Sequence, residues 1–127
     1  MNIKRTNKLV GVMLTLLFVL LPVHATEPWY RAITYSDLTF NAAEGESYGL
    51  EVVMVPSSDG MQVLWRSGSG RMERALLLDA VEEGKNYVVD VPPVIDGSGR
   101  WVLSIKEREM VAKGPRGQIF RLKKMPS

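Results

Sequence analysis

The chain of 127 residues contains no cysteine and a single histidine, His24. Without a thiol it can form neither a disulfide nor a Cys-His catalytic pair. It also lacks the His and Cys ligands from which zinc sites are usually built. Because His24 falls in a segment that we expect to be removed, a Ser-His-Asp triad is excluded as well. We therefore expect no enzymatic activity, no catalytic residue, no metal site and no cofactor.

Residues 1–25 have the parts of a secretory signal peptide. A basic start is followed by an apolar run from residue 9 to about residue 21, and small side chains at Val23 and Ala25 mark a cleavage site. The apolar run is shorter than the ~20 residues that a membrane-spanning helix needs. We expect cleavage after Ala25, which leaves residues 26–127 as a single β domain. That domain would not span a membrane and would be periplasmic or secreted, in a bacterium.

Removal of the leader changes the charge, because residues 26–127 keep 13 of the 16 Lys and Arg residues and all 14 Asp and Glu residues. Nucleic-acid binding needs a concentrated basic excess, so we expect no nucleic-acid partner. The remaining charges are uneven: residues 26–99 hold 5 bases and 12 acids, whereas residues 100–127 hold 8 bases and 2 acids. The basic segment either pairs with acidic strands where the sheet closes, or forms a positive patch for an anionic envelope component or an acidic protein.

Clusters of turn-forming residues separate short runs in which apolar and polar side chains alternate. This period of two is typical of half-buried strands. Ser58-Asp59-Gly60 and residues 114–117 predict tight hairpin turns, because glycine supplies the positive φ that such turns need. The side chains that we expect to face the core are Leu50, Val52 and Met54; Met61, Val63 and Trp65; Tyr87, Val89 and Val91; Trp101, Leu103 and Ile105; and Phe120 and Leu122.

We predict an all-β fold, an antiparallel meander of about seven or eight strands that forms a small barrel or a sandwich. The first strand is expected at residues 29–40 and the last at residues 118–124. Residues 71–83 fit two structures, because they are rich in helix formers but are also bracketed by Gly70 and Gly84 in the manner of a strand between turns. We favour the strand and keep the helix as the alternative.

Two other groups of residues have a functional interpretation beside a structural one. Glu107 and Glu109 could act as an acid and a base or bind Ca²⁺, but their basic neighbours are more typical of a solvated strand. The aromatic residues could line the cavity of a carrier of a small apolar ligand. An eight-stranded barrel is just wide enough for its own side chains, so an interior cavity above ~300 Å³ would favour the carrier.

Two glycine-containing turns each present a polar side chain, Asp96-Gly97-Ser98-Gly99-Arg100-Trp101 and Lys113-Gly114-Pro115-Arg116-Gly117. Their arrangement resembles that of the periplasmic inhibitors of C-type lysozyme, which are small exported barrels with a Ser-Gly-x-x-Tyr turn and a later aromatic-x-x-Lys-Gly-x-x-Ala turn. The resemblance implies that Ser98 and Lys113 would enter the lysozyme cleft and contact its catalytic carboxylates. The chain departs from the family pattern at Trp101, Met110 and Gly117, and it lacks the family's cysteines.

The sequence therefore predicts an exported, non-catalytic binding or interaction module, whose partner it does not identify. The alternatives are a lysozyme-inhibitor-like protein and a carrier of a small apolar ligand. The candidate partner-binding residues are Ser98, Arg100, Lys113 and Arg116.

Overall fold

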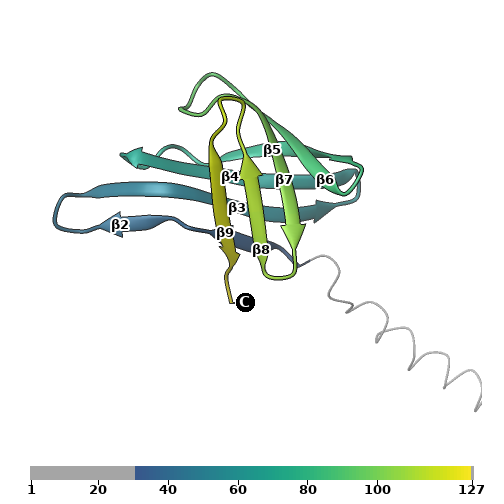
Figure 1. Cartoon of the computed structure of the whole chain (residues 1–127), viewed down its shortest axis with the longest axis horizontal. Coiled ribbons are helices and arrows are strands. Elements are labelled where there is room, and N and C mark those ends of the chain that lie inside the picture. The colour runs from purple at the N-terminus through teal and green to yellow at the C-terminus, as the bar shows by residue number, and fades with distance from the viewer. Residues whose placement is uncertain (1–30, 127) are drawn as a thin grey trace, which may run out of the picture. The chain divides into compact units, whose positions relative to one another are not determined.

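The alternating runs of the sequence form nine strands in the computed structural model, which describes residues 31–126 (Figure 1). The expected leader and the first residues of the predicted strand at 29–40 lie outside this range. The strands are β1 (Ile33–Ser36), β2 (Thr39–Asn41), β3 (Glu46–Ser57), β4 (Gly60–Gly70), β5 (Leu76–Glu83), β6 (Asn86–Val91), β7 (Gly99–Lys106), β8 (Glu109–Lys113) and β9 (Ile119–Lys124).

The strands form one closed antiparallel barrel. From β3 to β9 each strand pairs with the next along the chain, and β1 pairs with both β3 and β9. The barrel therefore has eight strands, and β2 is a short ninth strand that continues along β3. In Figure 1, β7, β8 and β9 cross in front of β3 and β4 at a steep angle. The predicted all-β meander is confirmed, and of its two architectures the structure is the barrel. Within residues 31–126, no helix is long and apolar enough to cross a membrane.

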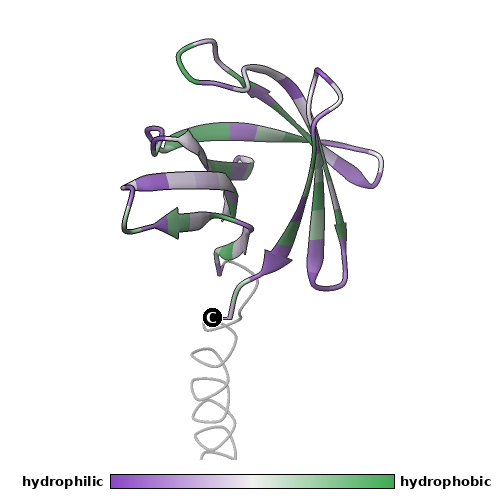
Figure 2. Cartoon of the chain, turned by 60° about the vertical axis from the view of Figure 1, so that its left-hand side comes forward, coloured by the Kyte–Doolittle hydropathy of each residue, from purple (hydrophilic) through white to green (hydrophobic). Residues whose placement is uncertain are grey.

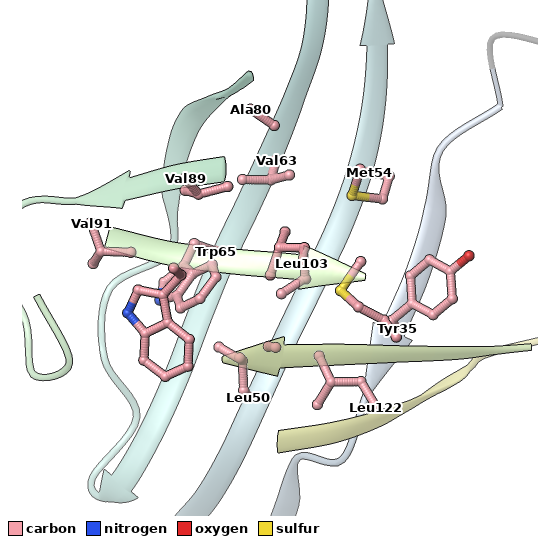
Figure 3. Packing of buried hydrophobic residues seen from close by; sticks show 14 of the residues in the cluster. Tyr35, Leu50, Met54, Val63, Trp65, Ala80, Val89, Val91, Leu103 and Leu122 are labelled. Carbon is pink, nitrogen blue, oxygen red and sulfur yellow. The ribbon is translucent and has the colours of Figure 1, made fainter. Parts of the chain in front are cut away.

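The core is built from the alternating side chains that the sequence predicted to face inward. Hydrophobic and hydrophilic residues alternate along the strands (Figure 2), and the inward side chains of opposite walls meet in the barrel interior (Figure 3). Every predicted inward residue is either buried or packed against the buried cluster. Tyr35 also belongs to this cluster, and burial raises the pKa of its phenol. The predicted inward faces are therefore confirmed.

The segment at residues 71–83 is a strand in its second part only. β5 begins at Leu76, so the helical alternative is wrong. Before it, Met72 makes an isolated bridge with Gly68, and the Glu73 backbone N–H donates to the Ser67 carbonyl at 2.9 Å. These bonds turn the chain at the end of β4 and delay the start of β5.

The predicted first strand is interrupted, since β1 ends at Ser36 and β2 starts at Thr39. At the break, the Asp37 backbone N–H donates to the Leu50 carbonyl at 3.1 Å, while the Asp37 carboxylate accepts the Leu50 N–H at 2.7 Å. The side chain thus takes the place of a backbone carbonyl in the ladder. The alternation of β3 also breaks here, because Gly49 has a φ of 115° and both Ser47 and Leu50 are buried.

Candidate functional site

The outer faces of β7, β8 and β9 form a three-stranded surface that is rich in cations. Because inward and outward residues alternate, the side chains next to the buried ones point to solvent, and all of the Lys and Arg residues on these faces are exposed. We call this surface the basic wall and define it by its five outward cations, Arg100, Lys106, Lys113, Arg121 and Lys123.

The strand register fixes how the basic wall is arranged. The rows that run across β7, β8 and β9 are Val102, Lys113 and Ile119; Ser104, Val111 and Arg121; and Lys106, Glu109 and Lys123. Aliphatic side chains therefore lie between the cations, and Ile119 is 59% exposed. The carboxylate within these rows is Glu109, which pairs with Arg121 at 3.2 Å.

The basic wall is not neutralised where the barrel closes. The strand that meets β9 at the seam is β1, which reads Ile-Thr-Tyr-Ser and carries no charge. At the seam Lys123 lies opposite Ser36 and Lys124 lies opposite Tyr35. The expected pairing of the basic segment with acidic strands where the sheet closes is therefore absent from this seam. Two cations of the wall are paired elsewhere, Arg100 with Glu83 of β5 and Arg121 with Glu109 of β8, and the wall as a whole keeps an excess of positive charge.

Two grooves follow the basic wall. One has a volume of about 300 Å³ and is lined by Ser104, Lys106, Glu109, Val111, Lys113 and Arg121. The other, of about 530 Å³, surrounds the β7–β8 turn and is lined by Lys106, Glu107, Arg108, Glu109, Arg121, Lys123 and Lys124. Because cations outnumber carboxylates in both, these grooves favour anionic groups.

Ser98 and Arg116, two of the four predicted residues, lie in loops at one end of the barrel, which we call the mouth. Ser98 is half-buried at the end of the β6–β7 loop, and Arg116 is exposed in the β8–β9 loop. The two loops touch, because a Cβ on Gly99 would come within 2.7 Å of the Pro115 Cγ. The structure therefore brings together the two turns that the sequence singled out.

The other two predicted residues, Arg100 and Lys113, lie on the basic wall near the mouth. Val102 of β7 lies opposite Lys113 of β8. Arg100, two residues before Val102, is therefore the diagonal neighbour of Lys113. The Arg100 Nη2 atom donates to the Glu83 Oε2 atom at 2.9 Å, so this ion pair spans β6. Lys113 alternates with the buried Ala112 and points outward.

The predicted site omitted five basic residues that the structure places on the basic wall or next to it. They are Arg121 at the middle of the wall, and Lys106, Arg108, Lys123 and Lys124 near the β7–β8 turn, at the opposite end from the mouth. The signal for them was present in the charge of residues 100–127, because consecutive strands of a meander are neighbours in space. Over residues 31–126, no group of three or more His, Cys, Asp or Glu side chains lies close enough to hold a metal ion.

The mouth also contains an apolar pocket of about 120 Å³, which we call the mouth pocket. Leu50, Trp65, Trp101 and Phe120 form its apolar part. Its volume is well below the ~300–1,000 Å³ of typical small-molecule sites. The mouth pocket is therefore too small for a long apolar ligand.

The chain matches no protein-family model, no curated protein and no solved structure. Its function must therefore be argued from its own surfaces.

Proposed function

We propose that this chain is an exported, non-catalytic binding protein whose basic wall docks onto anionic lipid headgroups of the cell envelope. The observation that carries the proposal is the gathering of five outward cations on three adjacent strands, with one carboxylate in their midst. The non-catalytic part rests on the lack of imidazole and thiol groups after residue 25. The export rests on the predicted leader.

The shape and composition of the basic wall favour a lipid surface over a compact ligand. The wall is a face of continuous sheet with shallow grooves, so it can meet an extended surface. Val102, Val111 and Ile119 stand between the cations and can reach the apolar boundary below the headgroups. The acidic residues lie mainly before residue 100, so repulsion of that part of the barrel would orient the molecule with β7–β9 toward the anionic surface.

Binding to vesicles tests the proposal. Residues 26–127 should sediment with vesicles of phosphatidylglycerol and phosphatidylcholine but not with phosphatidylcholine alone, and added salt should weaken the binding. Each basic residue near an anionic membrane contributes roughly 1 kcal/mol. The double variant Lys106→Gln/Lys123→Gln should therefore bind roughly thirtyfold more weakly.

The matched control is Arg74→Gln/Lys85→Gln, which removes the same charge from exposed positions outside the basic wall. It should bind like the unmodified protein. Equal losses in the two double variants would mean that net charge alone drives binding, and would contradict the assignment of the wall. Binding to soluble polyphosphate without binding to vesicles would contradict the lipid partner.

A second candidate function, inhibition of C-type lysozyme, is supported by the contact between the two turns at the mouth. Purified protein should then slow the lysis of a cell-wall suspension by a C-type lysozyme. The double variant Ser98→Ala/Lys113→Ala should lose that effect, whereas Ser104→Ala on the basic wall should keep it. Unchanged lysis in the presence of the unmodified protein would contradict this function.

A further inference from the structure

Trp65 and Ser67 each bury a polar atom that has no hydrogen-bond partner within the described part of the chain, the indole Nε1 and the hydroxyl Oγ. Both residues line the mouth pocket. They are two positions apart on β4, so they share a strand face and point to the same side. Trp65 is 1% exposed, and a buried donor without a partner costs about 1–3 kcal/mol. Such atoms call for an explanation.

The neighbouring indole, that of Trp101, has a hydrogen-bond partner. Trp101 packs edge-on against Trp65, with ring centroids 5.1 Å apart and an interplanar angle of 61°. The Nε1 atom of Trp101 donates to the Gly97 carbonyl at 2.6 Å. The protein therefore satisfies one of two adjacent indole N–H groups and leaves the other without a partner, in a residue that lines the mouth pocket.

The walls of the mouth pocket suit a flat apolar group. Trp101 also packs against Phe120, with centroids 5.9 Å apart. The β6–β7 loop covers one side through Asp96 and Gly97. This loop is held to the barrel by the buried side chain of Ile95 and by the hydrogen bond from the Ser69 hydroxyl to the Asp96 carboxylate at 3.1 Å. The pocket is thus built from packed elements rather than from a free loop.

The volume of the mouth pocket and the charge of its lining limit the kinds of ligand that it can bind. The volume of about 120 Å³ compares with an apolar cavity of ~150 Å³ that takes up one benzene ring. The charged residue in the lining is the acid Asp96, so an anionic ligand would be repelled. An indole N–H only donates, which requires an acceptor on the ligand.

We propose that the mouth pocket binds an uncharged, ring-sized group that carries a carbonyl oxygen. The ring lies against Trp101 and Phe120, and the carbonyl oxygen accepts the Trp65 Nε1–H, with the Ser67 hydroxyl as a second partner. This small-ligand site is independent of the basic wall and of lipid binding.

A matched pair of probes isolates the hydrogen bond. Acetophenone and α-methylstyrene have nearly the same shape, but the first has a carbonyl oxygen where the second has a methylene group. Titration of ¹⁵N-labelled protein should show both probes shifting resonances of the mouth pocket. Acetophenone alone should move the Trp65 indole proton downfield, and the Trp101 indole proton should not show that shift because it keeps its bond to Gly97.

Two variants make the test quantitative. Loss of the N–H in Trp65→Phe should weaken acetophenone binding roughly three- to tenfold relative to α-methylstyrene binding. Ser67→Ala removes little volume. It should also weaken acetophenone binding relative to α-methylstyrene binding, but by a smaller factor. Ser104→Ala on the basic wall and the double variant Lys106→Gln/Lys123→Gln should leave both affinities unchanged.

Three results would overturn the inference. The first is that neither probe shifts the Trp65 indole proton up to the solubility limit, which would mean that this N–H is only hydrated. The second is that both probes shift it equally. The third is that the ratio of affinities is the same in Trp65→Phe, Ser67→Ala and the unmodified protein. The vesicle assay does not test any of these three results. The proposal for the basic wall and the proposal for the mouth pocket can therefore be refuted independently.

Discussion

Glu107 is the single non-glycine residue with a positive φ among residues 31–126, with a value of 54°. It occupies the first position of the two-residue loop between Lys106 and Glu109, which are the last paired residues of β7 and β8. When only this position has positive φ, glycine is the preferred residue. A side chain there costs roughly 1–2 kcal/mol. The turn therefore holds local strain at the edge of the basic wall.

Replacing Glu107 by glycine should relieve that strain. Glycine has greater freedom in the unfolded chain, which costs the variant Glu107→Gly roughly 0.5–1 kcal/mol. Relief of the strain outweighs this cost, and the net stabilisation should be up to about 1.5 kcal/mol. The midpoint of urea unfolding measures it, with an unchanged slope. Arg108→Gly is the matched control, since Arg108 has no positive φ and glycine there should destabilise. Similar shifts in both variants would show that Glu107 is not strained.

The junction between β1 and β2 depends on Gly49 and Asp37. A Cβ on Gly49 would lie 2.6 Å from the Asp37 Oδ1 atom and 2.9 Å from its carbonyl oxygen. Gly49→Ala must therefore either displace the carboxylate from the Leu50 N–H or shift β3. In addition, the φ of 115° is unfavourable for any side chain. Both effects act on the strand that carries the longest pairing in the barrel.

Gly49→Ala should lower the free energy of unfolding by at least about 2 kcal/mol. Gly60→Ala separates the two causes, because Gly60 has a similar φ of 129° but no atom lies within 4 Å of the position that a Cβ would take there. It should show the conformational cost alone. Thermal and urea unfolding of both variants measure the difference, which reports the clash with Asp37. Equal losses of unfolding free energy in the two variants would mean that the Asp37 side chain moves away from the new Cβ at no energetic cost.

The elements that the sequence predicted well are those determined by local pattern. The alternation of Val63 and Trp65, or of Trp101 and Leu103, is visible in a single strand and predicts which face is buried. The break at Asp37 was missed because it depends on a bond to Leu50, which is distant in sequence. The late start of β5 was missed because good helix and strand formers do not reveal where a preceding turn ends.

For the whole barrel, the meander explains why part of the candidate site could be predicted. Strands that follow one another in the chain are neighbours in space, so a basic stretch of sequence becomes a basic surface. The mouth pocket could not be predicted in this way. Trp65 and Trp101 come from β4 and β7, and their contact depends on the curvature and register of the closed barrel. Only the Trp101 indole reaches the Gly97 carbonyl. The position of that loop carbonyl cannot be predicted from the alternation of side chains along the strands.

Closure itself rests on the short seam between β1 and β9. Tyr35 lies opposite Lys124 and Ser36 opposite Lys123, and beyond them the Met125 N–H donates to the Thr34 carbonyl at 2.8 Å. By contrast, the ladder between β3 and β4 runs from Ser47 to Ser57 of β3. Because the seam joins the first and last strands of the barrel, a covalent link across it should stabilise the whole fold.

The variant Ser36→Cys/Lys123→Cys tests this closure. The two positions are directly paired, and antiparallel pairs have Cα atoms ~4.5–5.5 Å apart, within the range of a disulfide. The chain has no other cysteine, so the intramolecular product has one possible pairing. The bond would close a loop from residue 36 to residue 123 and should raise the free energy of unfolding by about 2–4 kcal/mol over the reduced form.

The control is Thr34→Cys/Lys123→Cys, a pair displaced by two residues in register. Its diagonal separation of ~7–8 Å exceeds the usual reach of a disulfide, so it should stay reduced or form intermolecular dimers. Non-reducing electrophoresis and urea unfolding distinguish the two variants. If the displaced pair oxidised as readily as the direct pair, the seam would have a different register, and the positions of Lys123 and Lys124 on the barrel would have to be revised.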